Sequence, residues 1–241
     1  MSYAYANPYT VAASSETERA AFIRRTYTHL AASIGACALL VVLFFQIGVA
    51  ERMFSAIFVE GSVSWLIPLG AFMLVGFIAD RWATSDTSEA MQYVGLGLYI
   101  TAQALILLPL LFLAQRMVGD STLIAQAGVI TGLMVAGLTA VVFVTRKDFS
   151  FLRGAIMIGG FVAIGTIIAM TVFGGFGEGF SVLFTGGMLL LASASILYTT
   201  SNIMHHYNPQ QHVAASLALF AAVGLMFWYV LRLLMILRGG D

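Results

Sequence analysis

The stretch VAASLALFAAVGLMFWYVL, residues 213–231, decides the fold class of this chain. It is nineteen residues long and contains no acidic or basic side chain. At about 1.5 Å of rise per residue, an α-helix of this length spans nearly the ~30 Å hydrocarbon core of a bilayer. The stretch therefore predicts a transmembrane helix.

Six more apolar runs without charge precede this one, and each is long enough to cross a bilayer. With residues 213–231 they make seven predicted spans: 30–50, 61–79, 90–115, 121–145, 154–177, 179–204 and 213–231. The whole chain is 60% apolar and only 9% charged, far from the composition of soluble proteins. Because the runs are continuously apolar and do not alternate, helices are favoured over a membrane barrel. We predict an all-α integral membrane protein with seven transmembrane helices.

The predicted organisation is a short tail followed by one membrane domain. Residues 1–17 form a polar, Tyr-rich segment, and residues 18–241 hold the seven spans. Ser15 and Glu18 have the spacing of a capping box, so a helix is expected to begin there. The glycine-rich GGFGEGF, residues 174–180, is expected to be a tight turn between the fifth and sixth spans.

Orientation follows from Lys and Arg near the ends of the spans, because the richer side is usually cytoplasmic. With the N-terminus inside, the inner side holds seven basic residues and the outer side four. We therefore expect a cytoplasmic N-terminus and an external C-terminus. The inner set is Arg19, Arg24, Arg25, Arg81, Arg146, Lys147 and Arg153, and the outer set is Arg52, Arg116, Arg232 and Arg238.

Several function classes are disfavoured. The formal net charge is zero, so no basic surface for a nucleic-acid partner is expected. The chain has no His-Glu-x-x-His motif, no Gly-x-Ser-x-Gly elbow and no glycine-rich phosphate loop, which argues against an enzyme and suggests no cofactor. His205, His206 and His212 surround the last loop, but the acids are expected on distant loops, so we predict no metal site.

The break TRKDFSFLRG, residues 145–154, is the most distinctive short segment. Its basic residues anchor it at the cytoplasmic face, and Asp148 or Ser150 can cap the next helix. One interpretation is a tight anchor turn with Phe149 and Phe151 in the membrane interface. The other is a loop that docks a partner, and its candidate residues are Arg146, Lys147, Asp148, Phe149 and Arg153.

Four segments together resemble the Bax inhibitor-1 family. They are FIRRTYTHLAASI (22–34), the break at 145–154, ILYTTSNIMHHY (196–207) and SLALFAAVGLMFWYVLRLL (216–234), and they follow the family's order along the chain. The amino-acid sequence of these segments is most similar to the bacterial YccA-like branch, which implies a bacterial inner membrane. The resemblance also implies a bundle with the seventh helix at the centre, surrounded by the other six. The partner it implies is a membrane-anchored protease of the FtsH type, or a larger membrane complex.

The family's described calcium leak depends on two aspartates, and both are absent here. The corresponding residues are Thr199 on the sixth span and Ala222 on the seventh. Thr199 cannot titrate near neutral pH or attract calcium as a carboxylate does. Other polar side chains could line the region; these are Ser195, Thr200, Ser201 and Asn202.

Two functional hypotheses remain open. The favoured one is a non-enzymatic regulator or accessory subunit that acts through contacts with other membrane proteins. The alternative is a calcium or other cation leak that does not use an acidic pair. The missing aspartates shift the balance towards the regulator.

Overall fold

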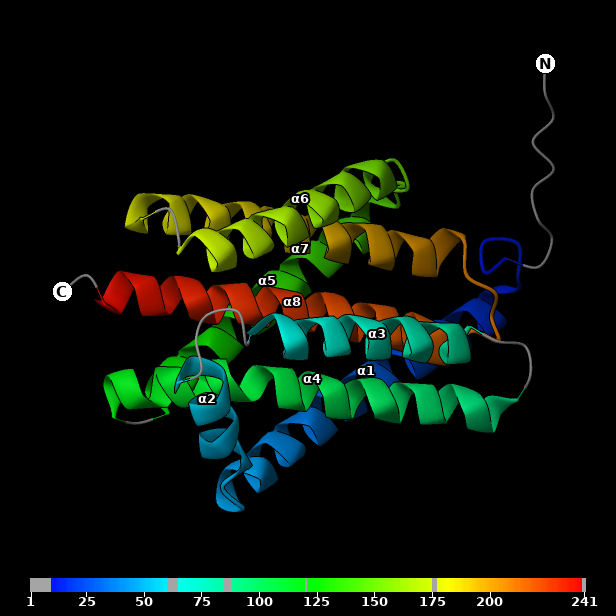
Figure 1. Cartoon of the computed structure of the whole chain (residues 1–241). Coiled ribbons are helices and arrows are strands. Elements are labelled where there is room, and N and C mark those ends of the chain that lie inside the picture. Colours follow the sequence, from blue (N-terminus) through cyan, green and yellow to red (C-terminus); the bar gives the residue numbers. More distant parts are fainter. Residues whose placement is uncertain (1–9, 60–64, 85–87, 120, 175–176, 240–241) are drawn as a thin grey trace.

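The computed structural model consists of helices joined by short connections throughout the residues it describes, which are 10–59, 65–84, 88–119, 121–174 and 177–239 (Figure 1). No strand occurs among them. The helices are α1 (Glu16–Gln46), α2 (Val49–Val59), α3 (Leu66–Ala83), α4 (Glu89–Val118), α5 (Thr122–Thr145), α6 (Leu152–Phe173), α7 (Glu178–His205) and α8 (His212–Gly239).

Seven of these helices are long and apolar enough to span a membrane, which confirms the predicted fold class. Helix α2 is the exception, because the predicted first span, 30–50, breaks near Gly48. The backbone at Gly48 has a φ of 75°, a conformation that glycine adopts without strain. Residues 49–59 then form a separate short helix. The next span begins at Leu66 rather than residue 61, so Pro68 lies in its first turn, where no backbone hydrogen bond is lost.

The predicted start of the first helix is confirmed. The Ser15 side chain accepts a hydrogen bond from the Glu18 N–H, and the Glu18 carboxylate accepts one from the Ser15 N–H. The glycine-rich connection between the fifth and sixth spans is shorter than the predicted 174–180, because residues 178–180 already belong to α7, and residues 175 and 176 lie outside the described residues. Helix α6 ends at Gly174, which has a φ of 82°, and α7 starts after Gly177, which has a φ of 84°.

Residues 10–14 of the predicted N-terminal tail lie against the bundle. Val11 is completely buried, and its N–H donates to the Tyr207 carbonyl at 2.8 Å. The Arg19 side chain donates to the carbonyls of Val11 and Ala12. Residues 1–9 of this tail lie outside the described residues.

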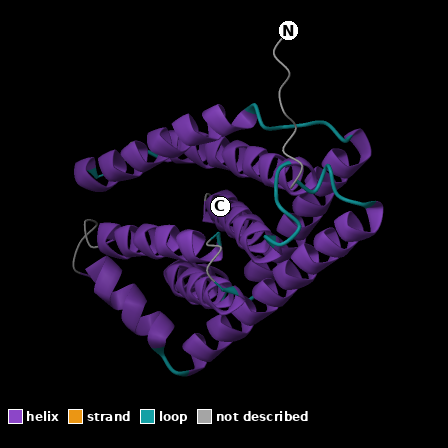
Figure 2. Ribbon diagram, turned by 90° about the vertical axis from the view of Figure 1, so that its right-hand side faces the viewer, coloured by secondary structure: helices purple, strands orange, loops and turns teal. Residues whose placement is uncertain are grey.

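Helix α8 lies in the middle of the bundle, as the family resemblance implies. It packs against α1, α3, α4, α5 and α7, and Figure 2 shows its C-terminal end near the centre of the view. Helix α4 is buried to a similar extent. Helix α6 packs mainly on α7 and meets α8 in a small cluster formed by Ala163, Met188 and Tyr229. The centre is therefore enclosed mainly by five helices, with α6 on the outside.

Small residues mark two helix faces that turn out to have different surroundings. On α8, Ala214 and Ala222 are buried against neighbouring helices, as expected for a packing stripe. The similar stripe on α5 is Gly128, Gly132, Ala136 and Ala140, and small residues of this kind usually mark a face where membrane helices pack closely. This stripe is exposed instead, and α5 buries a different face through Leu123, Ala127 and Thr131.

Candidate functional site

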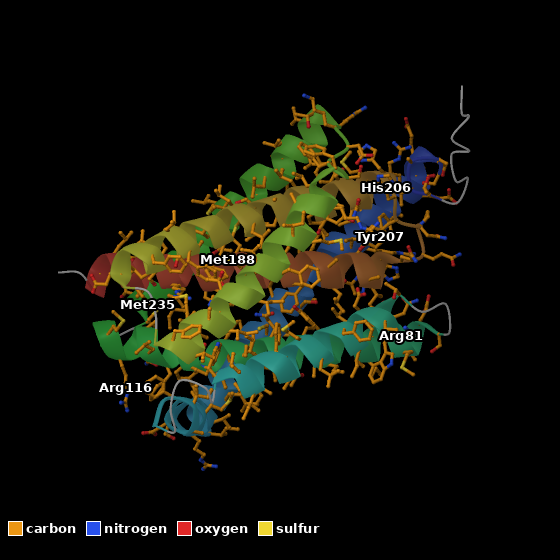
Figure 3. All side chains as sticks on the ribbon, turned by 45° about the horizontal axis from the view of Figure 1, so that its top comes forward. Arg81, Arg116, Met188, His206, Tyr207 and Met235 are labelled. Atoms are coloured by element: carbon orange, nitrogen blue, oxygen red, sulfur yellow. The ribbon has the colours of Figure 1, made fainter. Side chains whose placement is uncertain are left out.

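Most of the residues singled out in the sequence come together at the N-terminal end of the bundle. The starts of α1, α4, α6 and α8 lie there, together with the ends of α3, α5 and α7. Figure 3 shows Arg81, His206 and Tyr207 at this end, and Arg116 and Met235 at the opposite end. Ala222 and Ser195 lie deeper, since Ala222 comes ten residues after the start of α8 and Ser195 ten residues before the end of α7.

The α5–α6 loop, residues 146–151, is fastened to the end of α7. Helix α5 ends at Arg146, which adopts a left-handed conformation with a φ of 52°. The chain then turns so that the Phe149 N–H donates to the Ser201 hydroxyl at 2.8 Å. Ser201 is completely buried, so this bond gives a loop amide a partner inside the protein. Sequence reasoning named the loop and Ser201 separately and missed that they are bonded.

Asp148 makes a second connection between the same two segments. One carboxylate oxygen accepts the Ser150 N–H at 2.8 Å, and the other lies 3.1 Å from His206 Nε2. Partial burial opposes ionisation of Asp148, but the bonds from Ser150 and His206 outweigh it and lower the pKa of its carboxyl.

Two expectations about Asp148 were wrong. It does not cap α6, since that helix starts at Phe151 without a side-chain cap. Nor are all acids distant from the histidines of the last loop, because the loop geometry places Asp148 against His206. Neither side chain of this pair is buried: Asp148 is 44% exposed and His206 49%.

The outer surface of the loop combines cations with one projecting ring. Phe151 is 73% exposed, and Arg146, Lys147 and Arg153 are all exposed. Phe149 is half-buried, and its ring centre lies 6.1 Å from that of Phe151. The loop thus holds an exposed aromatic ring on a backbone fixed by bonds to α7.

The two positions that the resemblance aligns with aspartates lie in packed protein. Thr199 on α7 and Ala222 on α8 are both buried, on helices that pack against each other. The four suggested lining residues behave differently from one another. Ser195 donates to the Leu191 carbonyl of its own helix, Ser201 holds the α5–α6 loop, and Asn202 is half-buried.

Thr200, the fourth of them, faces a group of buried hydroxyls. The Tyr27 side chain on α1 lies close enough to interact both with Thr200 and with Thr139 on α5. None of the three oxygens has a partner in regular hydrogen-bond geometry, however. Buried hydroxyls of this kind usually bond to ordered water.

Two further polar contacts at this end were not foreseen. The Tyr93 hydroxyl lies 3.1 Å from His29 Nε2 and 3.4 Å from His212 Nε2, which connects α1, α4 and α8. Beside the docked Val11, burial together with the negative charge of Asp80 raises the pKa of Tyr207 to about 12. These residues are 64 or more positions apart in the chain, and no local spacing links them.

The expected histidine cluster is therefore divided. His206 contacts Asp148 of the α5–α6 loop and His205 bonds to the Ser201 carbonyl of its own helix, whereas His212 lies against His29. Within the described part of the chain, no three His, Cys, Asp or Glu side chains are grouped so that they could hold a metal ion. The single cysteine, Cys37, is buried in α1.

Comparisons with known proteins agree with the fold. A model of the family described as "Inhibitor of apoptosis-promoting Bax1" matches residues 19–239. An uncharacterized protein of Pseudomonas aeruginosa is 32% identical over 55% of this chain and 59% of its own length. An uncharacterized membrane protein of Vibrio cholerae is 25% identical over 80% of this chain and 83% of its own length. The Bax inhibitor 1 of Schizosaccharomyces pombe is 26% identical over 98% of this chain and 84% of its own length.

Proposed function

Because the chain belongs to the Bax inhibitor-1 family, we propose that it is a non-enzymatic membrane protein that regulates or assists a membrane partner through its α5–α6 loop. The partner suggested by the resemblance to the YccA-like branch is an FtsH-type protease or a larger membrane complex. Its location on this proposal is a bacterial cytoplasmic membrane, with the N-terminal end of the bundle in the cytoplasm.

The observation that carries the proposal is the combination of fixed backbone and exposed side chains in the loop. Bonds to Ser201 and His206 hold residues 148 and 149, while Phe151 and the flanking cations remain free to touch another molecule. A rigid aromatic anchor with charged neighbours is typical of binding hot spots, because little conformational entropy is lost on association. The loop thus has the physical character of a docking surface.

The polar side chains deeper in the bundle offer less support for a cation leak. Thr171, Thr185, Ser193 and Ser195 each donate to the carbonyl four residues earlier in their own helix. Hydroxyls used in this way are already satisfied by backbone and compete poorly for a passing ion. With Thr199 and Ala222 in place of carboxylates, α7 beyond its first turn and α8 carry none of the anionic oxygens that calcium prefers.

Photocrosslinking in native membranes tests the docking surface. A photoreactive residue at Phe151 should give a reproducible protein adduct, and changing Arg146 and Lys147 to Glu should weaken it. Phe161 is the matched control, since it lies on α6, which begins directly after Phe151, and is equally exposed at 73%. Lipid adducts alone at both positions would overturn the proposal.

Cysteine labelling tests the orientation. In a Cys37→Ala background, Lys147→Cys and Arg52→Cys place a single thiol at exposed positions on opposite ends of the bundle. An impermeant maleimide should label the second variant in intact cells and the first only after permeabilisation. The reverse pattern would place the N-terminal end outside.

A further inference from the structure

Helices α6 and α7 enclose an apolar groove on the outer surface of the bundle. It consists of two hollows of about 450 and 260 Å³, which share Val162. The larger is lined by Val162, Gly165, Thr166, Ala169 and Phe180, and the smaller by Gly159, Val162, Ala163, Phe184, Gly187, Met188 and Leu191. Only Thr166 carries a polar side chain, so the groove suits a hydrocarbon chain.

Glycines on α6 shape this groove. At Gly159 the helices are in close contact, because an added Cβ would lie 2.7 Å from Leu191 Cδ1. At Gly165 an added Cβ would meet no atom within 4 Å. The two helices are therefore close near Gly159 and leave open space near Gly165.

The groove extends from the middle of the bundle towards its C-terminal end. Val162 comes ten residues after Leu152, a rise of ~15 Å and hence about half of the hydrocarbon thickness. Phe180 lies in the first turn of α7, at the C-terminal end of the bundle. This range of depth corresponds to one leaflet of the membrane.

A cation is located where the groove reaches that end. Arg232 comes twenty residues after His212 on α8, a rise of ~30 Å that places it at the membrane face opposite the N-terminal end. Its guanidinium donates to the Ser181 hydroxyl at 3.3 Å and lies 5.8 Å from the centre of the Phe184 ring. Phe184 lines the smaller hollow. Ser181 is the residue after Phe180, which lines the larger hollow.

Arg232 has donor capacity to spare. Among the described residues its guanidinium forms no ion pair, although the exposed Glu178 begins the same turn of α7. A guanidinium has five N–H donors in a geometry that matches phosphate, and only one bond to protein is present.

We propose that this groove and Arg232 together bind an anionic phospholipid of the adjacent leaflet, with one acyl chain between α6 and α7 and the phosphate on the guanidinium. The apolar groove alone would accept any lipid, and the cation supplies the preference for negative charge. The site lies at the opposite end of the bundle from the docking loop and does not depend on the function proposed for that loop.

Native mass spectrometry with added lipid tests the proposal. Purified protein should retain phosphatidylglycerol about fivefold better than phosphatidylcholine with the same acyl chains, because both lipids carry a phosphate but only phosphatidylglycerol has a net negative charge for Arg232 to attract. Arg232→Gln should abolish this preference, and Arg232→Lys should keep part of it. The matched control is Arg238→Gln, which removes an exposed arginine at the same end of α8 and should leave the preference unchanged.

Filling the groove gives an independent readout. Gly165→Leu should lower retention of both lipids, whereas Gly154→Leu adds the same side chain to open space near the other end of α6 and should not. If Arg232→Gln retains phosphatidylglycerol as well as the unmodified protein does, or if Gly165→Leu has no effect, the proposed site is wrong.

Discussion

Two adjacent residues near the end of α7 illustrate how differently buried hydroxyls contribute to stability. The Ser201 hydroxyl accepts the Phe149 N–H, whereas the Thr200 hydroxyl has no regular partner. Both residues are completely buried. A buried hydroxyl stabilises a fold when its bonds are made and costs free energy when they are not.

We therefore expect opposite effects from removing the two hydroxyls. Ser201→Ala should lower the free energy of unfolding by about 1 kcal/mol, because it leaves the Phe149 N–H without its partner. Thr200→Val keeps the side-chain shape and should leave the stability unchanged or slightly raised. Thermal unfolding in detergent measures both. A loss in Thr200→Val equal to that in Ser201→Ala would show that Thr200 is bonded after all, for example through buried water.

The Asp148–His206 contact predicts a specific dependence of stability on pH. Folding lowers the pKa of Asp148, so its ionised carboxylate adds to the free energy of unfolding. This stabilisation is complete above the pKa of the unfolded chain, about 3.9, and is lost as the pH falls through the lower pKa of the folded protein. Asp148→Asn retains an oxygen acceptor for the Ser150 N–H and removes the charge. At neutral pH this variant should be less stable than the unmodified protein by well under 1 kcal/mol, because both side chains are largely exposed.

The difference between the two proteins should shrink as the pH falls below about 4. Thermal midpoints recorded between pH 3 and pH 7 provide the check. Parallel curves throughout this range would mean that ionised Asp148 does not stabilise the loop.

At the scale of elements, the crossing of α3 and α4 depends on a single missing side chain. A Cβ on Gly95 would lie 2.8 Å from the Ala79 carbonyl oxygen and 3.3 Å from the Ala83 nitrogen. Those neighbours are backbone atoms, so they cannot rotate out of the way. Gly97 lies on the same helix with nothing within 4 Å of its Cβ position.

The two glycines should accordingly respond in opposite directions to the same substitution. Gly95→Ala should destabilise the protein by about 1–3 kcal/mol, the usual cost of overpacking. Gly97→Ala should not lower the free energy of unfolding and can raise it by up to about 1 kcal/mol, because alanine has a better helix propensity than glycine. Thermal midpoints of the two variants decide the matter, and equal behaviour would mean that α3 can move away from α4 without loss.

The pattern of apolar residues along the chain predicted the helices well, but it did not predict which faces of the helices are buried. The apolar runs located all seven long helices, because the need to bury backbone polar groups in lipid leaves few alternatives. The break at Gly48 was missed because the residues on both sides are apolar. The stripe of small residues on α5 that begins at Gly128 faces outwards, and the sequence does not reveal this because small residues favour close packing without specifying a partner.

At the scale of the whole molecule, the candidate site could be predicted only in pieces. The loop residues and Ser201 were identified from the sequence, but the bond between Phe149 and Ser201 joins positions 52 apart. The same holds for Tyr93, which contacts histidines on two other helices. Such contacts depend on how the seven long helices are arranged. A single sequence that is not aligned with its relatives contains no direct signal for that arrangement.

The replacement of the family's aspartates leads to the last prediction, which concerns the bundle as a whole. The resemblance aligns Thr199 and Ala222 with an aspartate pair, and both are buried on helices that pack against each other, so carboxylates at these positions would ionise in surroundings of low dielectric constant. Two such groups are coupled, and the protonation of one changes the charge and the hydrogen bonding of the pair. The double variant Thr199→Asp with Ala222→Asp should therefore acquire a pH-dependent calcium flux in dye-loaded liposomes.

The unmodified protein should show no pH-dependent flux above that of empty vesicles. The double variant Thr199→Asn with Ala222→Asn is the matched control, because it introduces side chains of the same size that cannot ionise. If the unmodified protein shows the same pH response as the aspartate variant, the leak does not need an acidic pair. The cation-leak hypothesis would then replace the regulator, because the bundle would conduct with only neutral oxygens at these depths.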